Sequence, residues 1–173
     1  MSGLTVLLKK KADGSAALSC RRADGSVTWQ RQEGAQGRFF PLHDLTHFAV
    51  ETELEYAHGF FGLVAEGWDI TDFGRPWPRG ELPAEALLAE LVVGFLDLER
   101  ASGTRWSIEE LRASAASYAA QSGRPVDLRL LETDLDRIRE RRGLLFAQWA
   151  ALGAGETLEL RFQVPSRHAP PFP

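Results

Sequence analysis

The chain has 173 residues, of which 44 % are hydrophobic and 25 % charged, and its formal net charge is −4. This length and composition suit one folded domain with a hydrophobic core and exclude a disordered chain. Cys20 is the single cysteine, which excludes an internal disulfide and a zinc site built on several cysteines. The acidic balance predicts no nucleic-acid partner.

The most apolar stretch of the sequence runs from Leu87 to Leu98, and Glu90 and Asp97 interrupt it. It is therefore too polar to cross a bilayer. The first residues place their lysines after a very short apolar stretch, which is the wrong order for a signal peptide. We expect no membrane partner and a cytoplasmic protein.

Strand periodicity dominates the first forty residues. Apolar and polar side chains alternate over residues 4–9, 16–21 and 26–30, and Asp-Gly pairs at 13–14 and 24–25 suit tight hairpin turns between them. The same alternation returns over residues 157–164. The sequence therefore predicts a four-stranded antiparallel sheet made of a three-strand N-terminal meander and a C-terminal strand.

Helical periodicity fills the middle of the chain. Helices are expected at about residues 42–57, 60–66, 84–101, 108–121 and 127–152, with an irregular segment at 67–83. Ser107 and Glu110 have the spacing of a capping box. The expected fold is a single α+β domain over residues 1–164, with four or five helices covering the sheet, followed by an extended Pro-rich tail over 165–173.

Two of the four histidines, His43 and His47, stand four residues apart in the first predicted helix. Residues at this spacing share a helix face, so both imidazoles can bind one metal ion. This arrangement suits a tetrahedral zinc, and Asp44 would lie beside an open coordination position and accept a proton from bound water.

Glu66 is the expected third ligand. A chain reversal at His58-Gly59 would return Glu66 to the level of His47, since about ten residues of helix lead away and about nine lead back. One continuous helix would instead separate the two by about 28 Å. Glu51, one turn beyond His47, is the alternative third ligand of a site built on one helix.

These residues carry a resemblance to a known family. His43-Asp44-Leu45-Thr46-His47, eighteen further residues and Glu66-Gly67-Trp68 resemble the HExxH-x18-E motif of gluzincin metallopeptidases. The resemblance implies that His43, His47 and Glu66 bind zinc and that Asp44 stands in place of the catalytic glutamate. Asp is one methylene shorter than Glu, which disfavours peptidase activity more than metal binding.

Three interpretations of function follow: a small zinc-binding hydrolase, a degenerate relative without catalysis, and a metal-free ligand-binding or protein-interaction module whose histidine pair is structural. In the third, the segment 67–83 would bind a small molecule or peptide through its aromatic and basic side chains, namely Trp68, Arg75, Trp77 and Arg79. The free sheet edges are compatible with a homodimer.

The last predicted helix carries Arg142 as the one charge on its apolar seam. Either a bend at Gly143 or its own flexible stem lets the guanidinium reach solvent, or Arg142 pairs with a buried carboxylate.

Overall fold

A computed structural model describes residues 3–74 and 76–166. Its elements are, in chain order, β1 (Gly3–Lys10), β2 (Ala16–Arg21), β3 (Val27–Gln32), α1 (Phe39–Glu53), α2 (Phe60–Ala65), the 3₁₀ helix η1 (Ile70–Phe73), α3 (Ala84–Ser102), α4 (Ile108–Ser122), α5 (Glu132–Ala151) and β4 (Thr157–Gln163). The predicted α+β fold with a four-stranded antiparallel sheet and five helices is confirmed.

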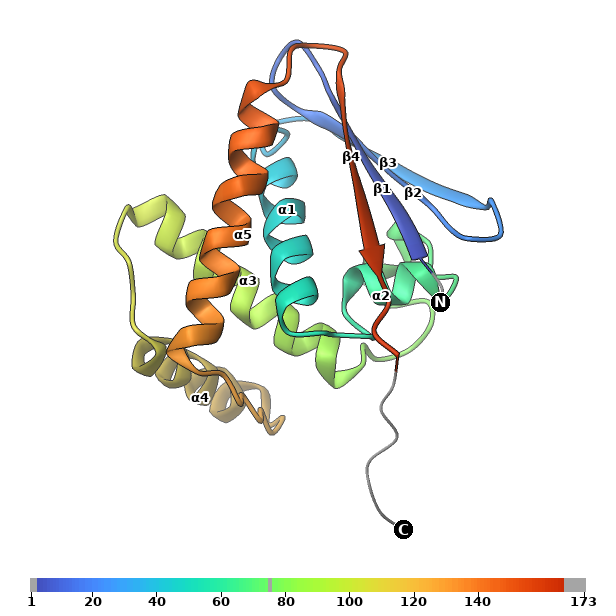
Figure 1. Ribbon diagram of the computed structural model, residues 1–173. Coiled ribbons are helices and arrows are strands. Elements are labelled where there is room, and N and C mark those ends of the chain that lie inside the picture. Colours follow the sequence, from blue (N-terminus) through green and yellow to red (C-terminus); the bar gives the residue numbers. More distant parts are fainter. Residues whose placement is uncertain (1–2, 75, 167–173) are drawn as a thin grey trace.

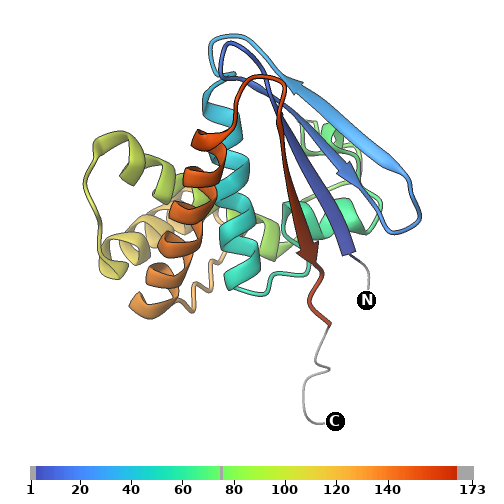
Figure 2. The same cartoon turned by 45° about the horizontal axis from the view of Figure 1, so that its top comes forward.

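The sheet has the strand order β3-β2-β1-β4, and all neighbours are antiparallel. Gly14 and Gly25 have φ angles of 82° and 85°, the left-handed backbone that the two Asp-Gly hairpin turns require. The last helix, α5, leads through a short turn into β4, which lies beside β1 (Figure 2). The first and last strands of the chain are thereby hydrogen-bonded neighbours.

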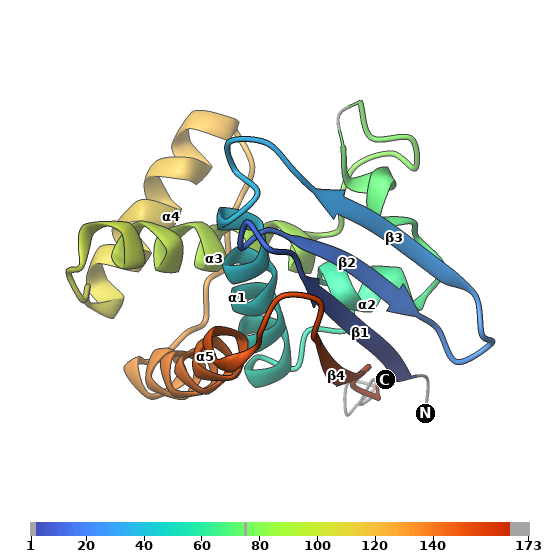
Figure 3. The ribbon, with the colours of Figure 1, turned by 90° about the horizontal axis from the view of Figure 1, so that it is seen from above.

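The helices lie on one face of this sheet. Alternate residues of β1 (Leu4, Val6 and Leu8) are buried against them. The opposite face has none of the described helices over it (Figure 3), and Trp29 on that face is 58 % exposed. This division follows from the period-two pattern of the strands.

Helix α1 is the centre of the helical layer, with α5 on one side and α3 on the other (Figures 1 and 3). Leu45, Phe48 and Ala49 of α1 are buried in the core. Any polar side chain on α1 therefore lies at the junction of sheet and helices.

Helix α1 begins at Phe39 rather than 42, and two further helix boundaries differ by four or more residues from the sequence prediction. Helix α1 ends at Glu53 rather than 57, because Glu55 adopts a positive φ of 52° that no helix continues through. Helix α5 begins at Glu132 rather than 127, and the Asp134 side chain accepts a hydrogen bond from the Leu131 backbone N–H at its start. Both ends are set by local backbone and capping rather than by apolar periodicity.

The described residues of segment 67–83 are irregular apart from η1, which packs beside β3 through a hydrogen bond from the Ile70 N–H to Thr28 Oγ1 (3.1 Å). None of the described helices combines the length and the apolar character needed to span a bilayer. The predicted Pro-rich tail lies outside the described residues from 167 onward.

Candidate metal centre

His43 and His47 lie on the same face of α1, as their spacing predicts. Their ring centroids are 4.8 Å apart and their planes are inclined by 74°. The His47 side chain is almost completely buried, while that of His43 is 22 % exposed. The pair thus has one inner and one more accessible imidazole.

A carboxylate fixes each ring through its Nδ1 atom. His43 Nδ1 lies 2.7 Å from Asp97 Oδ2, and His47 Nδ1 lies 3.1 Å from Glu51 Oε1. With Nδ1–H donated to a carboxylate, each ring keeps Nε2 as the atom for a metal ion. Metal-binding histidines characteristically have such a partner, which sets the tautomer and the ring orientation.

Glu90 of α3 provides the third group. Its Oε1 lies 3.2 Å from His47 Nε2, and one ligand atom from each of His43, His47 and Glu90 falls within 4.8 Å of the other two. The Glu90 side chain is 51 % exposed, so this side of the cluster opens to solvent. Two histidines and one carboxylate are a set that catalytic zinc sites use.

Glu66 does not join this group. The reversal after α1 does occur, and Gly59 is the residue that precedes α2, but α2 crosses α1 instead of running back along it (Figure 1). The Glu66 carboxylate is therefore carried to His58, whose Nε2 lies 3.2 Å from Glu66 Oε1. A return of Glu66 to the level of His47 requires α2 to run antiparallel to α1, and α2 does not run in that direction.

Glu51 orients His47 and caps α2 at the same time. Its carboxylate is fully buried, and it accepts hydrogen bonds from the Phe60 N–H (2.8 Å, to Oε1) and the Phe61 N–H (2.9 Å, to Oε2). A Cβ atom at Gly59 would lie 2.4 Å from Glu51 Cδ, so only glycine leaves room for this carboxylate. Glu51 thus accepts three hydrogen bonds and holds His47 in its orientation.

Asp44 is buried beside the histidines, and its Oδ2 accepts a hydrogen bond from Gln32 Nε2. Burial raises the pKa of Asp44 to about 6, against the opposing effects of the neighbouring histidines and Gln32. A carboxyl group with a pKa in this range can exchange a proton near neutral pH.

The histidines, Asp44 and Glu90 line one pocket of about 200 Å³. Its remaining wall comes from the sheet, from α1 and α2, and from the segment around η1, and its residues are Leu18, Gln30, Gln32, Phe40, Phe60, Ile70, Phe73 and Gly74. The wall is mostly apolar and aromatic, with the titratable groups gathered on the helix side. A small ligand in this pocket would contact both the apolar wall and the titratable groups.

Without a metal ion, His47 is a cation between two carboxylates. Burial alone would lower its pKa, but the hydrogen bonds and charges of Glu51 and Glu90 raise the pKa of His47 to about 10. A metal ion binding Nε2 must displace this proton. The same geometry therefore serves as an ion-pair triad around the buried His47 or as a metal site.

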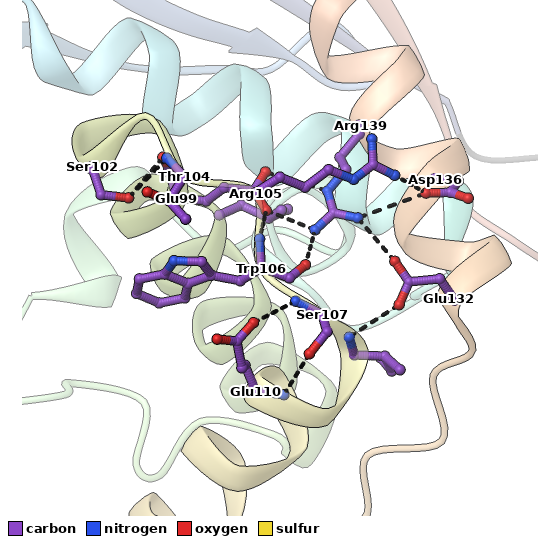
Figure 4. Close-up of polar contacts among 12 residues, drawn as sticks. Glu99, Ser102, Thr104, Arg105, Trp106, Ser107, Glu110, Glu132, Asp136 and Arg139 are labelled. Carbon is purple, nitrogen blue, oxygen red and sulfur yellow. Dashed lines mark hydrogen bonds and ion pairs between the residues drawn. The ribbon is translucent and has the colours of Figure 1, made fainter.

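Arg142 pairs with a buried carboxylate. Helix α5 continues through Gly143, and Arg142 donates to Glu99 Oε1 (3.1 Å) and to the Leu96 carbonyl (3.0 Å). Glu99 also accepts from Arg139 Nη2 at 2.6 Å (Figure 4). Figure 4 places the Arg139 guanidinium among Glu99, Glu132, Asp136 and the Trp106 carbonyl, so this network joins α3, α5 and the connection that precedes α4, away from the histidines.

The described aromatic and basic residues of segment 67–83 have partners within the protein. The Arg79 guanidinium lies 5.5 Å from the Trp68 ring centroid and donates to Asp72 Oδ2 (2.6 Å) and the Gly67 carbonyl (3.1 Å). Trp77 lies 6.0 Å from the Arg124 guanidinium carbon, and Arg75 is outside the described residues. These contacts hold the segment in place, and its predicted ligand binding stays a prediction.

Glu90, Asp97 and Gln32 belong to the site although the motif around the two histidines does not include them. Glu90 and Asp97 are seven residues apart, so they lie on one face of α3 and interrupt its apolar run. Two acids at this spacing in an apolar helix are a usable signal of a polar site.

No family model matches the chain, and neither the curated proteins nor the solved structures provide a significant match.

Proposed function

We propose that this protein binds one divalent metal ion, zinc in particular, through His43, His47 and Glu90. The observation that carries the proposal is the anchoring of both histidines by carboxylates, at 2.7 Å from Asp97 and 3.1 Å from Glu51. Metal-binding histidines characteristically donate the N–H that faces away from the metal to such a carboxylate. The convergence with Glu90 completes a three-ligand set that leaves a zinc coordination position for water or substrate.

The chemistry proposed for the site is hydrolysis. Bound zinc supplies a Lewis acid and lowers the pKa of a water molecule at its open position. Asp44 lies in the same pocket with a pKa raised to about 6, so it can accept a proton from that water at neutral pH. The Gln32 amide holds the Asp44 carboxylate in place.

Metal analysis tests the proposal directly. Protein purified without a histidine tag should contain about one equivalent of zinc, and metal-free protein should regain it with a higher melting temperature. His43→Ala and Glu90→Ala should abolish tight binding. Glu66→Ala is the matched control, because Glu66 contacts His58 and lies outside the cluster.

The outcomes separate the competing ideas. Loss of zinc from Glu66→Ala with retention in Glu90→Ala would restore the ligand set that the gluzincin resemblance implies. Metal-free protein whose melting temperature is unaffected by zinc, manganese or ferrous ions would contradict metal binding and favour the ion-pair triad of a metal-free module.

Cobalt substitution tests the role of Asp44. Co²⁺ in the zinc position gives a visible spectrum that changes when a bound water ionises. In Asp44→Asn this change should move to a different pH while cobalt affinity is largely kept. An identical pH profile would show that Asp44 has no contact with the metal-bound water.

A further inference from the structure

The Gln32 side chain, which lines the metal pocket, has an unused hydrogen-bond acceptor. Gln32 ends β3 and is only 4 % exposed. Its Nε2 donates to Asp44 Oδ2, while its Oε1 is buried and has no hydrogen-bond partner among the described residues. An acceptor left in this state costs folding free energy, so its retention calls for an explanation.

The orientation of this amide follows from its neighbour. A carboxylate offers only acceptors, so the Asp44 side requires the NH₂ group, and the carbonyl oxygen must point elsewhere. Gln32 is also one of the residues that line the pocket of about 200 Å³ containing His43, His47 and Glu90. The residue that carries the free acceptor and the proposed metal ligands therefore line the same small pocket.

The rest of the pocket is suited to an apolar group. Phe40, Phe60 and Phe73 line it together with Leu18 and Ile70. A cavity of about 150 Å³ holds a benzene molecule, so this pocket has room for one ring or short branched chain and a polar group of a few atoms.

We propose that the pocket binds a small amide-type ligand, whose carbonyl oxygen binds the metal ion and whose N–H donates to Gln32 Oε1, with an aromatic or aliphatic group against the phenylalanines. This inference rests on the proposed metal site. Amides and hydroxamic acids carry an acceptor and an N–H on neighbouring atoms, whereas an ester lacks the donor. Gln32 thus selects for the N–H group, because a ligand without it leaves the buried acceptor unpaired.

A pair of probe ligands tests this selection on the zinc-loaded protein. Benzohydroxamic acid has the N–H, and N-methylbenzohydroxamic acid has a methyl group in its place. By calorimetry, the wild-type protein should bind the first at least about tenfold more tightly, the factor that corresponds to one hydrogen bond to a buried group. Equal affinities would overturn the proposal and indicate that the ligand N–H does not reach the Gln32 oxygen.

The contribution of Gln32 itself is isolated by substitution. Gln32→Met keeps the length of the side chain and removes its amide, and should reduce the ratio of the two affinities several-fold. Any clash of the N-methyl group with the walls persists in the variant, so the change in the ratio reports the Gln32 contact. Gln30→Met, at an exposed residue lining the same pocket, should leave the ratio unchanged.

The two proposals fail differently. Protein that binds no metal contradicts the proposed function. Protein that binds zinc but does not bind benzohydroxamic acid, or keeps the wild-type ratio in Gln32→Met, contradicts only the amide selection. The comparison of ligands on the wild-type protein needs no variant, so it holds even if Gln32→Met does not fold.

Discussion

Replacing Glu51 by glutamine should weaken both the fold and the metal site. The Glu51 carboxylate accepts three hydrogen bonds, from His47 Nδ1–H and from the N–H groups of Phe60 and Phe61. A glutamine has one oxygen and an NH₂ group, so at least one of these buried donors would face another donor. The substitution also removes the negative charge beside the protonated His47.

The expected loss of stability follows from the burial of the Glu51 carboxylate. Breaking a fully buried charge pair by removing one partner costs about 3–5 kcal/mol. For a domain of this size, a loss of about 3 kcal/mol lowers the melting temperature by about 6–12 °C. Since Glu51 orients His47 without belonging to the three-ligand cluster, zinc affinity should fall by about 10–100-fold without being abolished.

Two measurements check this expectation. Urea denaturation of the metal-free protein gives the stability, and zinc titration against a competing chelator gives the affinity. Glu55→Gln is the control, since Glu55 is exposed, and its free energy of unfolding should change by less than about 0.5 kcal/mol. A loss below about 1 kcal/mol in Glu51→Gln would refute the buried-pair reasoning, and complete loss of zinc with little change in stability would make Glu51 a ligand.

Three further substitutions have defined outcomes. Gly59→Ala places a methyl group 2.4 Å from Glu51 Cδ, so it should lower the free energy of unfolding by about 1–3 kcal/mol and weaken zinc binding although it touches no ligand. Calorimetric unfolding measures the loss of stability, and the chelator titration measures the zinc affinity. An unchanged zinc affinity would contradict the steric argument. Asp97→Asn removes the charge that orients His43, and zinc affinity should fall by about tenfold in the same titration, whereas an unchanged value would mean that the orientation is unimportant. For Glu99, burial opposes ionisation, but Arg139 and Arg142 hold the pKa below the ordinary 4.5. Its stabilising contribution is thus present above pH 4.5 and lost as the pH falls through the lowered pKa, so the stability difference between wild type and Glu99→Gln should shrink in acid denaturation series; a constant difference would refute the ion-pair assignment.

The sheet follows directly from local sequence. The alternation of Leu4, Val6 and Leu8 and the Asp-Gly turns with positive φ at Gly14 and Gly25 depend only on neighbouring residues. The approach of His43 and His47 is equally local, since it needs one helix and a spacing of four. These features were predictable because short-range geometry determines them.

The remainder of the site depends on how helices pack. Glu90 reaches His47 because α3 lies against α1, and no spacing within the chain encodes that contact. Glu66 reaches His58 because α2 crosses α1, a direction that helix lengths do not specify. Gln32 meets Asp44 only after β3 has joined the sheet beneath α1.

The close approach of Glu51 and Gly59 has a consequence for divergence. A side chain at position 59 and a full-length glutamate at position 51 cannot occupy the same space. A related protein that gains a methyl group at 59 is therefore expected to carry a shorter acid or another residue at 51, and to supply a new acceptor for the amides at 60 and 61. The two positions should change together or not at all, which makes the pair a marker for descendants that retain this histidine site.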